Sequence, residues 1–298
     1  MFWVIFTITA TIFQTFRNLE QKSLNQKLDT LTVSWSRFIL PLPAALITLI
    51  YNASDATRPF LLYCTATAIF QILGNSLLLK TIKSRNFSIG IAFYKTEVLQ
   101  SMILGLLVFG TEISLGGFIA IIITSIGMVM MSNISFSKNI SFFKQFDNSA
   151  TFGAASGFCF AISAFNLKAG TQEMINIGHN YLSSAVIVLM WVITIQNIIF
   201  LLVKSWQKRL KQDLGKLFKA ENKWSFAKTG LLSFCGSVFW FAAYALGDNV
   251  VYVKAVGQIE LLFAVLVSHL HLKEKQKRSE IFGIIFTAIG ILSLILVH

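Results

Sequence analysis

The chain has 298 residues, of which 55% are hydrophobic and only 13% are charged, and its formal net charge is +12. Ordinary soluble domains carry about 25% charged residues, so this composition excludes a soluble globular protein and predicts a polytopic membrane protein. The three cysteines and four histidines lack metal-ligand spacing, and the sequence contains no phosphate-binding loop or catalytic triad. We therefore expect no metal, no cofactor, no nucleic-acid partner and no enzyme activity.

Ten apolar windows follow one another along the chain, and each is long enough to cross the bilayer as an α-helix. They cover residues 2–21, 32–52, 59–79, 88–109, 114–133, 150–169, 181–203, 226–247, 251–270 and 279–297. The first window follows Met1 with no charged region and no cleavage site, which favours a retained helix over a signal peptide. The sequence thus predicts an all-α integral membrane protein with ten transmembrane helices.

A basic linker, Lys204–Lys228, separates the seventh and eighth windows. Its lysines and arginines alternate with Trp206, Leu210, Leu214, Leu217 and Phe218. This pattern is typical of an amphipathic helix on an anionic membrane surface. A solvated loop that only sets topology is the alternative.

Basic residues lie mostly in the connections that follow odd-numbered windows. Besides the linker, these connections hold Lys22, Lys27, Lys80, Lys83, Arg85, Lys138, Lys144, Lys273, Lys275, Lys277 and Arg278. The connections after even-numbered windows hold only Arg58, with Lys168 just inside the sixth window. Because basic loops stay on the cytoplasmic side, we expect the odd-numbered connections to be cytoplasmic and both termini to be outside.

The ninth window is apolar except for Lys254, Gln258 and Glu260. Glu260 comes ten residues into a window of about twenty, so its carboxyl would lie near the bilayer midplane. A charge there costs about 2.5–3.5 kcal/mol on insertion scales, so this side chain must face other helices or a water-filled cavity.

The two halves of the chain resemble each other. Residues 97–131 parallel residues 260–294, with Glu97 on Glu260 and Gly127 on Gly290, in both cases 163 positions apart, and with Glu112 nearly on Glu274. A repeat of five spans must be inserted upside down relative to the first copy. We therefore predict two inverted five-helix repeats, 1–147 and 148–298, of the kind that transporters use for alternating access.

Three stretches are similar to the EamA-like branch of the drug/metabolite transporter superfamily. SWSRFILPLPAALI (34–47) resembles the second-span stretch of the family, with Arg37 and Phe38 matching. LVFGTEISLGGFIAIIITSIGMVM (107–130) and VGQIELLFAVLVSHLHLKEK (256–275) resemble the fourth-to-fifth-span turn and the ninth-span segment. The resemblance implies a basket of helices around a central cavity, lined chiefly by spans 1, 3, 4, 6, 8 and 9. Many members have their basic loops after even-numbered spans, whereas this sequence has the opposite bias.

These features predict a secondary transporter in the inner (plasma) membrane that moves a small polar metabolite, such as an amino acid or a related compound. Alternating access, with coupling to protons or by exchange, is the expected mechanism, and membrane lipids are expected partners. A membrane-embedded lipid-handling protein or enzyme is the alternative, and the basic linker is its best support.

Glu97 and Glu260 are the leading candidates for substrate binding or coupling. On a straight helix, at 3.6 residues per turn, Lys95 and Glu97 point roughly 200° apart, and Lys254 lies roughly 120° from Glu260. Each lysine should therefore pair with a group on another span, for which spans 4 and 9 offer a natural geometry, or the helix must unwind, for example at Gly257.

Other candidates surround this pair. Arg37, with Arg17, either extends to the membrane interface or offers a fork for a substrate carboxylate or phosphate. Tyr94, Trp240 and Tyr244 would give the cavity aromatic walls. The Gln258 amide either binds substrate or links helices.

Overall fold

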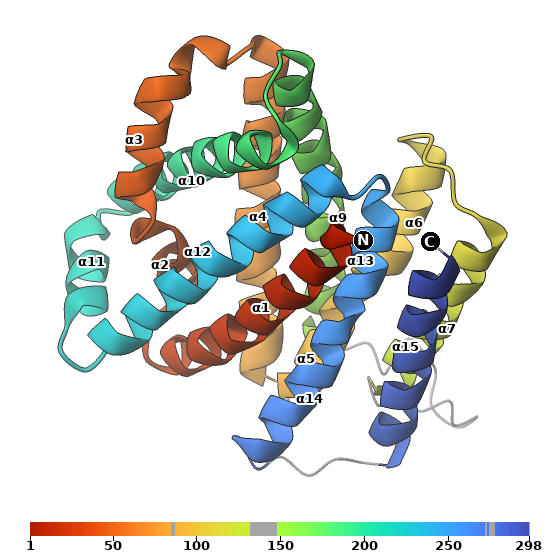
Figure 1. Ribbon diagram of the computed structural model, residues 1–298. Helices are drawn as coiled ribbons and strands as arrows, with labels where there is room; N and C mark the ends of the chain where they lie inside the picture. Colours follow the sequence, from red (N-terminus) through yellow and green to blue (C-terminus); the bar gives the residue numbers. More distant parts are fainter. Residues whose placement is uncertain (85–86, 132–147, 272, 274–277, 298) are drawn as a thin grey trace.

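The computed structural model describes residues 1–84, 87–131, 148–271, 273 and 278–297, and every regular element in these ranges is helical (Figure 1). The helices of the first half are α1 (Phe2–Lys27), α2 (Thr30–Ile39), α3 (Leu42–Asn52), η1 (Ala53–Asp55), α4 (Arg58–Ser84), α5 (Phe87–Tyr94), α6 (Glu97–Leu107) and α7 (Leu115–Met131). Those of the second half are α9 (Asn148–Asn176), α10 (Tyr181–Trp206), α11 (Leu210–Phe218), α12 (Lys223–Leu246), α13 (Val250–Val256), η2 (Gly257–Ile259), α14 (Glu260–Leu270) and α15 (Arg278–Val297).

The predicted windows all fall on helices, but the helices differ in length and continuity. In the described ranges, five are long and apolar enough to cross a membrane, and α2 with α3 adds a sixth as a pair bent by 54°. The bend follows from Pro41, because a proline lacks the backbone N–H that would continue α2. Residues 115–131 and 281–297 form shorter apolar helices. The structure thus supports a multi-pass membrane protein, while the count of ten spans stays a prediction.

Helix α1 is polar on its inner face and apolar on its outer face. Thr11, Asn18 and Gln21 are completely buried, whereas Phe2 and Ile5 are 74% and 60% exposed. This reverses the usual arrangement of a soluble protein, where large apolar side chains are buried. Such a helix fits a lipid environment outside and a polar interior.

Helices from the two halves pack along one another. Helix α1 runs beside α12, α4 beside α9, and α7 beside α15 (Figure 1). In the predicted repeat, spans 1 and 8 correspond to spans 6 and 3, so the first two pairs are equivalent under exchange of the halves.

The contact between α7 and α15 is also equivalent under exchange of the two halves. A Cβ on Gly127 would collide with Thr287 and would lie 2.6 Å from Gly283 O, whereas one on Gly290 would lie 2.7 Å from Thr124 N. Thr124 and Thr287 are themselves 163 positions apart, as the two glycines are. Each helix therefore presents a glycine to the threonine of the other, which lets the backbones approach closely.

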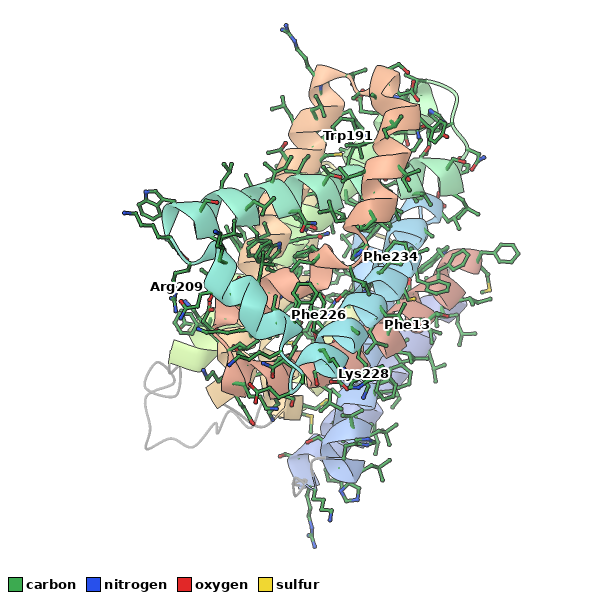
Figure 2. The ribbon with its side chains drawn as sticks, turned by 90° about the vertical axis from the view of Figure 1, so that its left-hand side faces the viewer. Phe13, Trp191, Arg209, Phe226, Lys228 and Phe234 are labelled. Carbon is green, nitrogen blue, oxygen red and sulfur yellow. The ribbon has the colours of Figure 1, made fainter. Side chains whose placement is uncertain are left out.

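The basic linker contains a helix, α11, and not only a loop. Its Leu217 is buried, whereas Trp206 and Phe218 are 85% and 59% exposed, and Arg209 lies at the outer edge of the molecule in Figure 2. One basic residue of the linker, Lys204, does not face the surface.

Lys204 is completely buried at the end of α10. Its Nζ lies 2.7 Å from Asp213 Oδ2 in α11 and 3.4 Å from Asp29 Oδ1, and it donates to Thr32 Oγ1 at 2.8 Å. Asp29 also caps α2 by accepting hydrogen bonds from the backbone N–H groups of Leu31 and Thr32. The ammonium of Lys204 therefore ties α11 to the first turn of α2.

Some predicted features lie outside the described residues. These are the match of Glu112 to Glu274, and the basic residues Arg85, Lys138, Lys144, Lys275 and Lys277.

Candidate functional site

The two aligned glutamates occupy equivalent places in interrupted helices. Helix α5 ends at Tyr94, and α6 begins at Glu97 after two turn residues. Helix α13 ends at Val256, a single turn of 3-10 helix follows, and α14 begins at Glu260. Each carboxylate therefore stands in the first turn of a half-helix, where the helix dipole favours negative charge.

The lysines pair across the two interrupted spans, as predicted. Lys95 Nζ lies 2.9 Å from Glu260 Oε2, and Lys254 Nζ lies 2.9 Å from Glu97 Oε2. Lys95 also reaches Glu97, because span 4 is not a straight helix and the interruption before α6 brings Lys95 Nζ to 3.4 Å from Glu97 Oε1. Near Gly257 the helix tightens into a 3-10 turn and does not unwind, and Gly257 O accepts a hydrogen bond from Lys95 Nζ at 2.9 Å.

Glu260 is completely buried and surrounded by donors. Besides Lys95, its carboxylate accepts hydrogen bonds from Asn18 Nδ2 (2.9 Å), Gln14 Nε2 (2.7 Å) and Tyr94 Oη (2.5 Å). Gln14 Oε1 in turn accepts a hydrogen bond from Trp240 Nε1 at 2.8 Å. Glu260 therefore joins α1, α5 and α14 as the centre of a polar network.

Glu97 has fewer partners and lies beside a cavity of about 60 Å³. Among the described residues its carboxylate contacts only the ammonium groups of Lys95 and Lys254. Mostly polar and aromatic side chains from both halves, with two aliphatic ones, line the cavity: Gln14, Arg17, Arg37, Gln71, Tyr94, Glu97, Phe160, Ser163, Ala164, Leu167, Ser237, Trp240, Phe241, Tyr244 and Lys254. A polar cavity of this size holds a few water molecules.

Aromatic rings form one wall of the cavity, as predicted. The rings of Trp240 and Tyr244 stack with centroids 5.6 Å apart. Lys254 Nζ lies 5.8 Å from the centroid of Tyr244 and 5.9 Å from those of Trp240 and Phe160. These distances allow cation–π attraction, which adds to the pairing of Lys254 with Glu97.

Both arginines lie in the protein interior, so of the two alternatives that the sequence left open, extension to the membrane interface is wrong. Arg17 and Arg37 are 2% and 5% exposed, and both line the cavity. Arg37 Nη1 donates to Asn75 Oδ1 at 2.8 Å, and Arg17 Nη2 donates to Asn18 Oδ1 at 2.8 Å. The packing of α1, α2 and α4 holds them away from any interface.

Gln258 differs from the other candidates. It is completely buried, it does not line the cavity, and neither its Oε1 nor its Nε2 has a hydrogen-bond partner in the described part of the chain. Lys95 and Glu260 also lie outside the cavity lining, although they belong to the same network. The structure therefore brings together all the predicted residues except Gln258.

Residues 1–133 and 149–296 both match the EamA-like transporter family. The chain belongs to this family. A solved structure described only as "Crystal structure of protein" matches with a TM-score of 0.67 at 10% identity, over 99% of this chain and 96% of that one, and so shares the fold. No curated protein matches the sequence.

The family assignment fits the described site. Members of the EamA-like family are membrane transporters and not enzymes, and small molecules are therefore the expected substrates. The described residues contain no group of three or more His, Cys, Asp or Glu side chains that could hold a metal ion. The two matched segments give this EamA-like transporter a two-repeat architecture.

The resemblance implied that span 1 lines the cavity, but the sequence did not link the polar face of α1 to Glu260. Gln14 and Asn18 both donate to Glu260, although they lie in a span that was selected for its apolar content. A signal was present, because polar residues recur every three or four positions at Thr7, Thr11, Gln14, Asn18, Gln21 and Asn25. At 3.6 residues per turn such positions share one helix face, which in this EamA-like transporter points at the site.

Proposed function

We propose that this protein is a secondary transporter that moves a small polar metabolite, an amino acid or a related compound, by alternating access across the inner membrane. The observation that carries the proposal is the cavity at the two helix interruptions. Its charged lining comes from both matched repeats. Transporters of inverted-repeat design bind substrate near the bilayer midplane, at interrupted helices between the repeats.

The size of the cavity supports an alternating mechanism. The cavity of about 60 Å³ has room for a few waters. Substrate entry would enlarge it by moving the helices of one repeat relative to the other. The half-helix α6 begins at Glu97 in the cavity lining, and rocking of the repeats would open the cavity to either side in turn.

Glu97 is the coupling group that we propose, and Glu260 is its structural counterpart. Glu97 lines the cavity and is held by Lys254 and Lys95. Protonation of Glu97 would release Lys254, which in turn would be free to bind substrate. Glu260 already accepts hydrogen bonds from three side chains besides its ion pair, so protonation would disrupt the whole network.

We propose the topology that the basic residues indicate: ten spans in two inverted units, 1–147 and 148–298, with odd-numbered connections cytoplasmic and both termini outside. The arrangement of the helices is compatible with it. The α3–α4 and α9–α10 connections lie at the upper edge of Figure 1, whereas the C-terminal end of α14 and the start of α15 lie at the lower edge.

Uptake into proteoliposomes tests the proposal. The purified full chain is reconstituted with a pH gradient and offered a panel of radiolabelled amino acids and related metabolites. Wild type should accumulate at least one of them, and the pH dependence should disappear in Glu97→Gln. Glu221→Gln, which removes an exposed carboxylate of the linker, is the matched control. If wild type accumulates no solute above empty liposomes, the proposed function is wrong.

A further inference from the structure

The charged side chains around the cavity do not balance. Arg17, Arg37, Lys95 and Lys254 are four cations, and Glu97 and Glu260 are the carboxylates that face them. Each lysine has a carboxylate at 2.9 Å. Neither arginine has an Asp or Glu oxygen within 4.0 Å among the described residues. An excess of two positive charges therefore remains at the arginines.

Both arginines form hydrogen bonds with neutral side-chain amides and not with carboxylate counterions. Arg37 donates to the carbonyl oxygen of Asn75, whose Nδ2 donates to Ser34 Oγ at 3.0 Å. Arg17 donates from Nε and Nη2 to the carbonyl oxygen of Asn18. These contacts fix the direction of both guanidinium groups without neutralising them.

Donor capacity remains unused on both groups. A guanidinium carries five N–H hydrogens and stays protonated at every pH that proteins experience. In the described structure Arg37 forms one side-chain hydrogen bond, from Nη1, and its buried Nε has no partner. Arg17 uses Nε and Nη2, both on the same asparagine oxygen. Both arginines line the cavity, so both side chains border the space that a ligand would enter.

A buried cation without a counterion is strongly unfavourable, because desolvation is not offset by a partner. A ligand that brings negative charge to the cavity removes this cost, and the planar fork of arginine matches a carboxylate or a phosphate. A cationic ligand would add to an existing excess of positive charge. The charge balance therefore favours a negatively charged ligand.

We propose that the ligand of this cavity is an anion, whose carboxylate or phosphate group binds between Arg17 and Arg37. The role of this anion as a transported substrate rests on the proposed transport function. Its binding to the cavity does not, because binding can occur without translocation. The aromatic wall of Phe160, Trp240 and Tyr244 would contact the less polar part of the ligand. A soluble metabolite and the headgroup of an anionic lipid both supply this chemistry.

The test is thermal unfolding of the detergent-purified full chain with defined probes at constant ionic strength. Inorganic phosphate and succinate represent soluble anions, dioctanoyl phosphatidylglycerol represents a lipid headgroup, and putrescine represents a cation. Sodium chloride is the reference. We expect phosphate, succinate or the lipid to raise the unfolding midpoint of wild type, and putrescine to have no effect. Response to the free anions identifies a soluble ligand, and response to the lipid alone identifies a headgroup.

Variants then locate the binding. Arg17→Gln and Arg37→Gln should each raise the apparent dissociation constant for the stabilising anion by at least about thirtyfold. A loss of this size is expected when one partner of a buried charge pair is removed. Arg209→Gln, which removes an arginine at the outer edge of the molecule (Figure 2), should behave as wild type. Arg37→Lys keeps the charge but loses the fork, so it should bind more weakly than wild type. This variant carries the test if Arg37→Gln is not monodisperse.

The inference is overturned if no anion stabilises wild type, if putrescine stabilises it as well as the anions do, or if the cavity variants respond as Arg209→Gln does. Its failure is distinct from failure of transport. Uptake of a neutral amino acid without anion binding would refute the anion site and support the transport function. Anion binding without any uptake would support the anion site and refute the transport function.

Discussion

Lys254 Nζ lies 2.9 Å from Glu97 Oε2, so a cation of the second repeat neutralises a carboxylate of the first. Both side chains are buried, at 6% and 2% exposure. Loss of one partner of such a pair leaves an uncompensated charge, whereas loss of both leaves a neutral and only slightly altered cavity.

A double-mutant cycle on this pair should show strong coupling. Lys254→Met should lower the free energy of unfolding by about 3–5 kcal/mol, and Lys254→Met combined with Glu97→Gln should recover about 1–3 kcal/mol of that loss. Equilibrium unfolding in detergent measures both. Lys211→Met, at an exposed position of α11, serves as the control, and additive effects at 97 and 254 would contradict the pairing.

The two glutamates should differ when each is replaced by glutamine. Glu260→Gln leaves at least one of Gln14, Asn18 and Tyr94 without its acceptor and leaves Lys95 without its closest carboxylate. We expect a loss of at least about 3 kcal/mol in stability, and a smaller loss for Glu97→Gln, whose side chain borders the cavity. Equal losses, measured by unfolding in the same detergent, would show that both carboxylates are structural.

The reciprocal glycines of α7 and α15 predict a stability effect without any change in charge. Gly127→Ala and Gly290→Ala should each cost about 1–3 kcal/mol, because the added methyl group meets backbone atoms that cannot move freely. Gly215 in α11 has nothing within 4 Å of a built Cβ. Gly215→Ala should therefore be neutral or stabilise by up to about 1 kcal/mol. If the alanines at 127 and 290 are as well tolerated as the one at 215, the close approach of α7 and α15 is wrong.

The contact of α11 with α2 should depend on pH through Asp29, which lies between α1 and α2. Burial alone would raise the pKa of this carboxyl, but hydrogen bonds from Thr32 and the charge of Lys204 outweigh it and lower the pKa below the usual value. A lowered pKa means that the ionised side chain stabilises the fold above the unfolded-state value of about 3.9. This contribution is lost as the pH falls through the lower folded-state pKa.

Asp29→Asn isolates this effect, because asparagine caps a helix about as well as aspartate does. The difference in unfolding midpoint between wild type and Asp29→Asn should be largest above about pH 5 and should shrink below about pH 4. Thermal unfolding across a pH series gives the comparison. A difference that grows as the pH falls would refute the assignment.

The sequence predicted the positions of the helices better than the composition of the site. Apolar windows locate membrane helices well, since lipid imposes a length and a composition on each of them. The aligned carboxylates of Glu97 and Glu260 also led to the correct pairing across spans, because a buried charge needs a partner and the neighbouring lysines point elsewhere on a straight helix.

The rest depended on three-dimensional placement. Gln258 and Glu260 are two positions apart, yet only Glu260 reaches the polar face of α1, and the intervening 3-10 turn is not apparent from hydropathy. The sequence left Arg17 and Arg37 open between the membrane interface and the cavity, because hydropathy alone does not show how the helices pack around a side chain. The bend at Pro41 and the packing of α2 against α4 place Arg37 against Asn75 in the interior.

The polar face of α1 has a consequence for biosynthesis. Asn18 donates to Glu260, which is 242 residues further along the chain. A ribosome therefore releases α1 long before α14, its principal hydrogen-bonding partner, exists. A nascent chain that stops after the first repeat would leave Glu97 without Lys254, and Asn18 without its acceptor Glu260, in a hydrocarbon environment. Proteases that survey the membrane for polar faces could use this difference to separate unfinished molecules from finished ones.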